Sequence, residues 1–367
     1  MRSVVFAYHD IGYVCLQELL RSGATVAAVL THQDDRQEEI WFRSVRALAE
    51  ERGLPVFVPD SVNTPEWIER IGSWQPDFLF SFYYRKILCR EILNLAKHGA
   101  LNLHGSLLPK YRGRCPVNWV LIHDERETGV TLHYMEEKPD RGDIVAQRAV
   151  PITDDDTALT LFRKMTEAAA LLMRESYPLL VSGHAPRRPQ VQAQASYFGG
   201  RKPEDGRIDW SQPARAIFNL VRAVTHPYPG AFTSWQGRRL YVWEARPAPA
   251  TQPATAETVD KREPHPSRRS QEKGPPQGER KLSFENNNRT ARPEEPPSCG
   301  GVSKGARWSK STAGAAVGAV IATAPELLVQ TRSEPLRLLR VQLEGEPEVL
   351  GTECASRYGI EEGVLFR

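Results

Sequence analysis

The chain has 367 residues, of which 40% are hydrophobic and 25% are charged. This composition is close to that of average globular proteins, which excludes a fibrous or wholly disordered protein. At roughly 100–200 residues per domain, the length predicts two or three domains. No apolar run approaches the roughly 18 residues that a membrane-spanning helix needs, so we expect no membrane span. The N-terminus turns polar too early for a secretory signal and the five cysteines form no Cys-x-x-Cys pair, so we expect a reducing, cytoplasmic location without a zinc site.

The net charge of +3 is unevenly distributed along the chain. Residues 251–310 contain 12 Lys and Arg residues against 8 Asp and Glu residues, so the rest of the chain is close to neutral. Because nucleic-acid phosphates are bound by clustered cations, this balance argues against a nucleic-acid partner. The basic stretch itself is interpreted as a solvated segment rather than a binding arm.

Short apolar runs alternate with amphipathic stretches over the N-terminal part of the chain. Between two of these runs, Thr64 and Pro65 predict the N-cap and first turn of a helix. The alternation predicts an α/β fold with a doubly wound, mostly parallel sheet. The strands are predicted at residues 4–7, 26–30, 56–58, 78–82 and 100–103, with a hairpin-like extension at 129–135 and 144–150.

A helix, a linker and a second domain are predicted to follow. Residues 154–156 are three aspartates, which favour the N-terminus of a helix that carries an apolar stripe up to Met173. Residues 184–205 contain three prolines and are interpreted as a linker, after which Ser211 is predicted to cap another helix. Further strands predict a small C-terminal β-barrel-like (OB-like) domain. They lie at 231–235, 239–243, 316–323, 327–330 and 336–342.

This small domain is interrupted by a Pro-rich insertion. Ten prolines fall between Pro247 and Pro297, and large apolar side chains are scarce from residue 251 to residue 306. Such a segment cannot bury enough surface to offset its chain entropy, so we predict that residues 247–313 are disordered. The small domain is therefore expected to consist of residues 206–246 and 314–367.

The most informative stretch is Asn102-Leu103-His104-Gly105-Ser106-Leu107-Leu108-Pro109, which follows the fifth predicted strand. Open α/β sheets bind ligands beyond the carboxyl ends of their parallel strands. Asn102 and His104 are two residues apart, so on a strand their side chains point to the same face. An amide that donates to a developing oxyanion, next to an imidazole that handles protons, is suited to acyl transfer. On spacing alone, ordinary polar residues at a strand end remain the alternative.

In context, this stretch resembles the signature of the folate-dependent formyltransferases, which move a formyl group from 10-formyltetrahydrofolate to an amine. The run 128–135, followed by Asp140-Arg141-Gly142-Asp143, is similar to the second motif of that family. The resemblance covers residues 1–246 clearly and 314–367 weakly. It implies a Rossmann-like formyltransferase fold with the catalytic domain at residues 1–183.

The resemblance also implies roles for particular residues. Asn102 would stabilise the oxyanion, His104 would relay the proton of the amine, and Asp140 would orient His104. 10-Formyltetrahydrofolate would be a co-substrate, and no metal is expected. Lys86 stands where the family would have a histidine. The folate pocket maps onto Lys86, Ile87, Leu88, Arg114, Glu136, Glu137, Lys138, Pro139 and Asp140.

A sugar nucleotide is the second small-molecule partner that the resemblance implies. Tyr111, Arg112 and Arg201 are its expected ligands, since guanidinium groups match diphosphate oxygens. A plain surface role is the alternative for each arginine. Four further runs resemble the branch of the family that formylates UDP-4-amino-4-deoxy-L-arabinose in lipid A modification and polymyxin resistance. These runs are residues 6–10, 81–85, 109–114 and 118–121.

The sequence also bears on three other functions. A methionyl-tRNA acceptor is disfavoured by the near-neutral charge of the chain outside residues 251–310. Hydrolysis of formyltetrahydrofolate would use the same catalytic residues and stays open. A regulator that binds folate or a nucleotide without catalysis is disfavoured because Asn102, His104 and Asp140 are all present.

Overall fold

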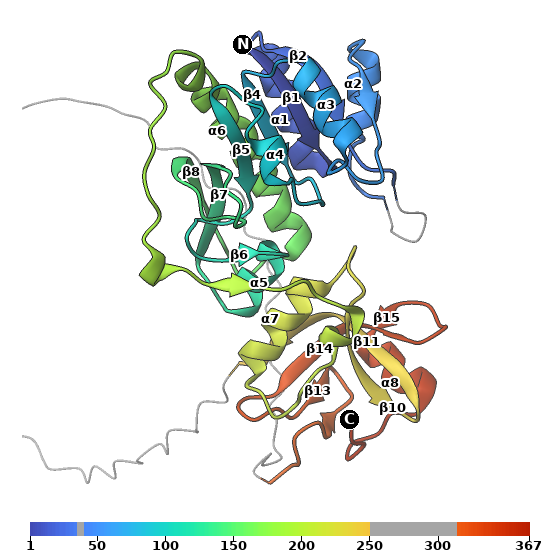
Figure 1. Cartoon of the computed structure of the whole chain (residues 1–367). Helices are drawn as coiled ribbons and strands as arrows, with labels where there is room; N and C mark the ends of the chain where they lie inside the picture. Colours follow the sequence, from blue (N-terminus) through green and yellow to red (C-terminus); the bar gives the residue numbers. More distant parts are fainter. Residues whose placement is uncertain (35–39, 250–313) are drawn as a thin grey trace, which may run out of the picture. The chain divides into compact units, whose positions relative to one another are not determined.

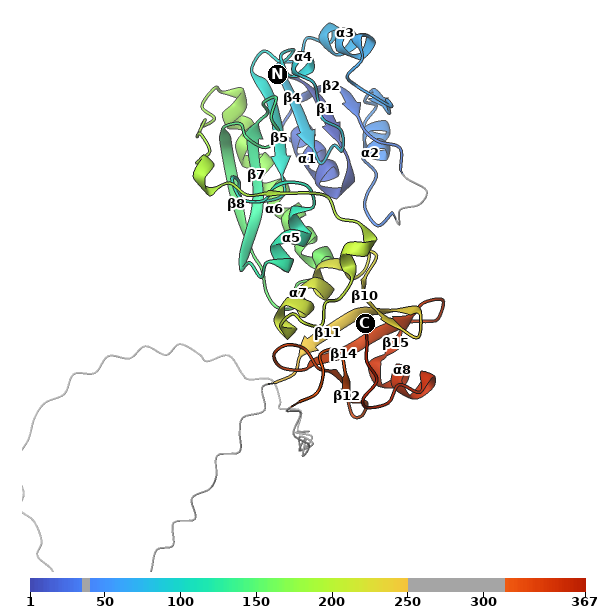
Figure 2. The ribbon, with the colours of Figure 1, turned by 60° about the horizontal axis from the view of Figure 1, so that its bottom comes forward.

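The N-terminal domain is built on the alternating strands and helices that the sequence predicts (Figures 1 and 2). The computed structural model describes residues 1–34, 40–249 and 314–367. The strands of its large sheet lie in the order β3-β2-β1-β4-β5-β7-β8. Strands β1 to β5 pair in parallel, and β7 and β8 pair antiparallel at the edge. The mostly parallel sheet and its hairpin extension are thereby confirmed. The strands are β1 (Arg2–Ala7), β2 (Thr25–Leu30), β3 (Val56–Phe57), β4 (Phe78–Phe82), β5 (Gly99–His104), β7 (Glu127–Tyr134) and β8 (Ile144–Pro151).

Helices cover both faces of this sheet. In β1, Val5 and Ala7 belong to one buried cluster, which includes residues of α1 and α6, whereas Val4 and Phe6 belong to another with residues of α3 and α4. This alternation is that of a strand with a helix layer on each side. Within the described ranges, no helix is long and apolar enough to cross a membrane. The helices are α1 (His9–Arg21), α2 (Val45–Glu51), α3 (Pro65–Ser73), α4 (Arg90–Leu93), α5 (Pro116–Ile122) and α6 (Ala158–Val181).

Two of these helices begin with threonine caps. In α3, the Thr64 hydroxyl accepts from the Trp67 N–H at 3.4 Å and Pro65 is the first helical residue, as predicted. In α6, Thr157 is the N-cap and exchanges hydrogen bonds with Thr160. The three aspartates at 154–156 directly precede this cap at the N-terminal end of α6, as expected, and the Asp156 carboxylate accepts from the Thr160 hydroxyl at 3.1 Å.

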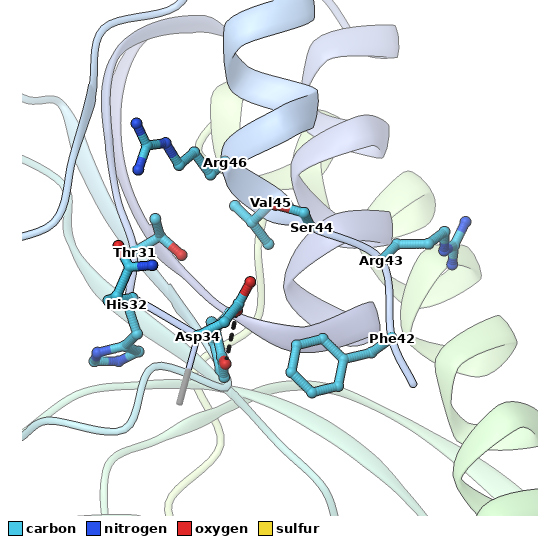
Figure 3. Close-up of a pocket in the computed structure, with 10 residues that line it drawn as sticks. Thr31, His32, Asp34, Phe42, Arg43, Ser44, Val45 and Arg46 are labelled. Carbon is cyan, nitrogen blue, oxygen red and sulfur yellow. Dashed lines mark hydrogen bonds between the residues drawn. The ribbon is translucent and has the colours of Figure 1, made fainter. Parts of the chain in front are cut away.

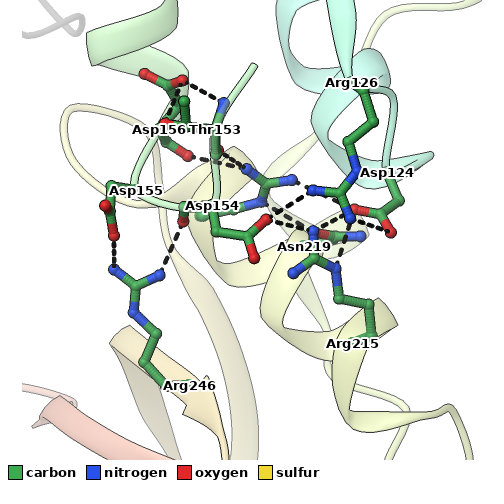
Figure 4. Close-up of polar contacts among 10 residues, drawn as sticks. Asp124, Arg126, Thr153, Asp154, Asp155, Asp156, Arg215, Asn219 and Arg246 are labelled. Atoms are coloured by element: carbon green, nitrogen blue, oxygen red, sulfur yellow. Dashed lines mark hydrogen bonds and ion pairs between the residues drawn. The ribbon is translucent and has the colours of Figure 1, made fainter. Parts of the chain in front are cut away.

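Those aspartates are also engaged with basic side chains (Figure 4). Arg215, at the start of α7 (Ala214–Val224), contacts Asp124 at 2.5 Å and Asp154 at 2.7 Å. Asp155 pairs with Arg246 at 2.8 Å. Helix α7 is capped by Pro213 and not by Ser211, whose hydroxyl donates to Asp209 at 2.6 Å. The ion pairs tie α7 to the loops that follow α5 and precede α6.

The C-terminal domain is an antiparallel β-sheet in the order β10-β11-β14-β13-β12, with β15 paired to β14. Strand β11 pairs with β14, so segments from both sides of residues 250–313 share one sheet, and the predicted small β-rich domain is confirmed. The expected start of the insertion at residue 247 is slightly early, because Pro247 still pairs with Leu336; residues 250–313 lie outside the described ones. The elements are β10 (Ala231–Trp235), β11 (Arg238–Pro247), β12 (Val320–Ala322), β13 (Leu327–Val329), β14 (Leu336–Leu343), β15 (Val349–Leu350) and α8 (Gly351–Tyr358).

The expected linker at residues 184–205 contains a short strand. Strand β9 (Tyr197–Phe198) pairs in parallel with β6 (Arg112–Gly113). In addition, the Tyr111 N–H donates to the Ser196 hydroxyl at 2.9 Å. This segment is therefore joined to the loop that follows β5.

Candidate active site

The register of two neighbouring strands places the candidate catalytic residues. Asn102 of β5 lies opposite His133 of β7, and His104 lies opposite Thr131. The loop after β5 is fixed by Thr131, whose hydroxyl donates to the Ser106 carbonyl at 2.6 Å and accepts from the Leu108 N–H at 3.1 Å. Strand pairing thus sets the positions of both side chains and of the loop that follows them.

His104 is buried, and its ring orientation is determined by a backbone carbonyl. Its Nε2 atom lies 2.8 Å from the Tyr111 carbonyl oxygen. A carbonyl can accept but not donate, so Nε2 carries a hydrogen and Nδ1 has the free lone pair when the ring is neutral. Nδ1 lies 3.6 Å from Oδ1 of Asp140. A proton taken up at Nδ1 therefore produces a cation next to a carboxylate.

Asp140 reaches the site from the loop between β7 and β8. Its backbone has a φ of 59°, in the left-handed region that non-glycine residues seldom adopt. Its Oδ2 atom accepts from the Gly113 N–H at 2.9 Å. Its Oδ1 atom faces His104 and lies 3.7 Å from Nε2 of His133. The structure therefore places the rings of His104 and His133 near one carboxylate oxygen of Asp140, and Asn102 joins this group through His133.

His133 belongs to this cluster, although the sequence analysis did not select it. Its Nδ1 atom donates to the Tyr134 carbonyl at 2.8 Å, so its Nε2 atom accepts from Nδ2 of Asn102 at 3.1 Å. Burial lowers the pKa of His133 to about 4, and the nearby Asp140 opposes this shift. His133 thus stays neutral at physiological pH and fixes the orientation of the Asn102 amide. The signal that could have identified His133 is its position on the neighbouring strand, opposite Asn102.

The expected sugar-nucleotide ligands lie in different environments. The Tyr111 hydroxyl donates to Glu125 at 2.7 Å, and the Tyr111 ring stacks on Phe198. Arg201 lies over the Trp119 ring, with its guanidinium carbon 4.8 Å from the ring centre. Arg112 is 1% exposed, and its guanidinium is engaged inside the protein, so it offers no open fork to a diphosphate.

The expected folate residues lie on two loops, except for Arg114, which lies elsewhere. After β4, the Lys86 ammonium donates to the Pro59 and Asp60 carbonyls, Ile87 is 68% exposed, and Leu88 is buried. After β7, residues 136–139 are exposed and lead to Asp140. Arg114 is exposed and lies against Gly200, where an added Cβ would be 3.0 Å from its guanidinium. Arg114 therefore contacts the segment that carries Arg201.

A cavity lies at a different place, beyond the ends of β1 and β2 (Figure 3). Its volume is about 30 Å³, which is enough for only a few water molecules. The Tyr8 hydroxyl donates to Asp34 across it at 3.0 Å. This cavity is too small for a folate or a sugar nucleotide. Its wall is formed by Tyr8, Thr31, His32, Gln33, Asp34, Phe42, Arg43, Ser44, Val45 and Arg46.

Solved structures share this fold. The N-formyltransferase from Helicobacter canadensis, solved with folinic acid and dTDP-3-aminofucose, has a TM-score of 0.51 and 20% identity over 67% of this chain and 87% of its own. A sugar N-formyltransferase from Shewanella has a TM-score of 0.54 and 19% identity over 66% of this chain and 96% of its own. HypX from Aquifex aeolicus, in complex with tetrahydrofolic acid, has a TM-score of 0.55 and 16% identity over 100% of this chain and 50% of its own.

The sequence itself matches one family in both domains. Residues 2–176 match the family described as Formyl transferase. Residues 201–267 match its C-terminal domain, and the second match extends beyond residue 249, where the described part of this region ends. Together the two matches cover about two thirds of the chain. The chain therefore belongs to the formyl transferase family of enzymes.

Proposed function

We propose that the protein transfers the formyl group of 10-formyltetrahydrofolate to the amine of a nucleotide-linked amino sugar, UDP-4-amino-4-deoxy-L-arabinose. The observation that carries this proposal is the largely buried cluster of Asn102, His104, His133 and Asp140, in which Asp140 lies close to both rings and Asn102 contacts His133. It combines an amide donor, a ring nitrogen that can accept a proton, and a carboxylate that stabilises the resulting cation. These are the groups that acyl transfer to an amine requires.

In the proposed mechanism, each side chain has a separate step. The amine nitrogen attacks the formyl carbon, and the carbonyl oxygen becomes an oxyanion that the second N–H of Asn102 stabilises, since the first donates to His133. The amine loses a proton to Nδ1 of His104, next to Asp140. The bond between the formyl carbon and N10 of the folate then breaks, and N10 receives the electron pair and the proton. The products are the formamide of the sugar and tetrahydrofolate.

The neutral state of His133 matters for this sequence of steps. A histidine that became protonated would no longer accept a hydrogen bond from Asn102, and it would compete with His104 for the charge of Asp140. Because burial lowers the pKa of His133 to about 4, this ring stays neutral and keeps its lone pair for the Asn102 amide. In the proposed mechanism, His104 therefore transfers the proton and His133 orients the amide of Asn102.

For the formyl donor, we propose a site between the loop at Lys86–Leu88 and the loop at residues 136–140. The backbone of the first loop is fixed by a residue from another part of the chain, since the Asn63 side chain donates to the Ile87 carbonyl at 2.9 Å. The exposed Ile87 side chain is an apolar surface for a planar ring system. Relatives with this fold were solved with folinic acid and with tetrahydrofolic acid, which supports a folate as the donor.

For the acceptor, we propose that Arg201, together with Tyr111 and the β9 segment, binds the sugar nucleotide. The Arg201 guanidinium is half-buried over Trp119, and Arg114 lies nearby against Gly200. Such a pair of guanidinium groups suits a diphosphate. The relative from Helicobacter canadensis was solved with a dTDP-amino sugar, which supports the substrate class. The motif runs named above favour the UDP-linked arabinose derivative within that class.

An acceptor panel tests the proposal. The protein is incubated with 10-formyltetrahydrofolate and, in turn, with UDP-4-amino-4-deoxy-L-arabinose, dTDP-3-aminofucose, initiator methionyl-tRNA and buffer, and the formylated product is identified by mass spectrometry. We expect the UDP-amino sugar to be formylated fastest. Preferred formylation of the dTDP-amino sugar would show that the acceptor carries dTDP and not UDP. Formylated tRNA, or free formate without any acceptor, would contradict the proposed acceptor class.

A further inference from the structure

A glutamine from the segment between the domains contacts the backbone of the turn that carries Asp140. Gln190 is buried, and its Nε2 atom donates to the backbone carbonyls of Asp140 at 3.0 Å and Gly142 at 2.8 Å. Both of its N–H groups are thereby directed to the turn that carries the catalytic carboxylate.

The orientation of this amide is fixed by a buried arginine. The Nε and Nη2 atoms of Arg112 donate to Oε1 of Gln190 at 3.2 and 2.6 Å. A guanidinium can only donate, so the amide oxygen faces Arg112 and the amide nitrogen faces the turn. The remaining contact of Arg112 runs from Nη1 to Oε1 of Gln192 at 2.9 Å. Within residues 1–34, 40–249 and 314–367, no carboxylate lies within ion-pair distance of Arg112.

The turn itself needs such support. Asp140 has a positive φ of 59°, and this conformation is costly for a residue other than glycine. At Gly142, an added Cβ would lie 2.0 Å from the Tyr134 carbonyl oxygen, so the backbone passes very close to β7. The hydrogen bonds from Gln190 hold both ends of this strained turn.

We propose that Gln190, oriented by Arg112, is a positioning residue for formyl transfer, and that it holds the turn at Asp140–Gly142 so that the carboxylate faces His104. This inference rests on the proposed function, because it assumes that Asp140 supports His104. It gives Arg112 a role inside the protein, in place of the contact with the sugar diphosphate that the sequence suggested.

The chain offers matched variants for a test. Gln190→Leu removes both hydrogen bonds to the turn. Gln190→Glu keeps an oxygen that accepts from Arg112. Its second oxygen replaces the amide nitrogen, so the two hydrogen bonds to the carbonyls of Asp140 and Gly142 are lost. Gln192→Leu is the control, because Gln192 also accepts from Arg112 but makes no contact with the turn. Asp140→Asn is the reference for loss of the carboxylate charge.

Two measurements are made on each full-length variant. The first is the ¹³C signal of the His104 ring at neutral pH, assigned with a His104→Gln variant; it reports the surroundings of His104 and does not depend on turnover. The second is the pH profile of kcat together with KM for the amino sugar. Thermal unfolding confirms that each variant is folded.

We expect Gln190→Leu and Gln190→Glu to move the His104 signal in the same direction as Asp140→Asn. Both should lower kcat by up to about 100-fold, as a small displacement of a reacting group does, and leave KM within a few-fold of the parent. Gln192→Leu should keep the parent signal and pH profile. An unchanged His104 signal in both Gln190 variants, with a clear change in Asp140→Asn, would overturn the inference. Absence of formyl transfer by the parent would instead refute the proposed function, and the His104 signal would still test the role of Gln190.

Discussion

At the scale of single residues, the candidate site contains two buried histidines in different hydrogen-bonding states. His133 donates from Nδ1 and accepts at Nε2. His104 donates from Nε2 and leaves Nδ1 free, facing Asp140. The backbone carbonyls of Tyr134 and Tyr111 impose these two states. Side chains of one type therefore take different roles because the backbone offers each ring an acceptor at a different nitrogen.

Asp140→Asn tests the role of the negative charge. The substituted amide can still accept from the Gly113 N–H through its oxygen, so the loop should keep its place, while the charge that faces His104 is lost. We expect kcat to fall by about 10²-fold or more, as for loss of acid–base support, with nearly unchanged folate affinity. Single-turnover formyl transfer and a folate titration measure the two quantities. Turnover equal to that of the parent would remove Asp140 from the mechanism.

At the scale of elements, local sequence signals predicted those parts of the fold that depend on neighbouring residues. The Thr64-Pro65 start of α3 and the buried strand at residues 78–82 are examples, because a cap and an apolar run act over a few positions. The start of α7 was misplaced, because Ser211 bonds to Asp209 instead of capping the helix. The aspartates at 154–156 precede α6 as predicted, but the ion pairs of Asp154 with Arg215 and of Asp155 with Arg246 depend on residues far along the chain and have no local signal.

The same distinction applies to the site. Asn102, His104 and Asp140 became candidates through the resemblance of two motifs to those of the folate-dependent formyltransferases, because the spacing of Asn102 and His104 alone left ordinary polar residues as the alternative. Gln190 could not be found in this way, since its role depends on a loop some 50 positions away in the chain. The pairing of β6 with β9 could not be predicted either, because strands of two residues are too short to show a periodic pattern of apolar residues. Tertiary contacts alone create these parts of the site.

The N-cap of α6 provides a test at this scale. Thr157 accepts from the Thr160 N–H at 3.3 Å, and α6 packs against α1 and the edge of the sheet. Thr157→Ala should lower the free energy of unfolding by about 1 kcal/mol, the usual cost of losing a cap. Thr157→Ser, which keeps the hydroxyl, should stay close to the parent. Urea unfolding measures both variants, and equal stability of Thr157→Ala and the parent would contradict the assigned cap.

At the scale of the whole molecule, buried and half-buried histidines make stability depend on pH. Burial lowers the pKa of His9, His32 and His133 to about 4 each, from an ordinary value of 6.5. The unfolded chain therefore binds more protons than the folded protein between these two values. The free energy of unfolding then rises with pH in that window, so acidification from pH 6.5 toward 4 should destabilise the protein.

Urea unfolding at several pH values in that window measures this effect. His32→Gln should make the slope of stability against pH shallower, because one buried titrating group is removed. His184→Gln, at an exposed position, should leave the slope unchanged. Stability that is constant or increases as the pH falls would show that these rings are not held neutral in the folded protein.

The central claim is that Asn102 and His104 act together on one tetrahedral intermediate. Its most direct test is steady-state formyl transfer by Asn102→Ala, His104→Ala and the double variant, with calorimetric titration of the amino-sugar nucleotide. We expect losses of about 10²–10³-fold for Asn102→Ala and about 10²–10⁴-fold for His104→Ala. The double variant should lose less than the product of the two, because both residues act on the same intermediate, and all three should still bind the nucleotide. Near-normal turnover in either single variant, or loss of nucleotide binding in step with activity, would contradict the account.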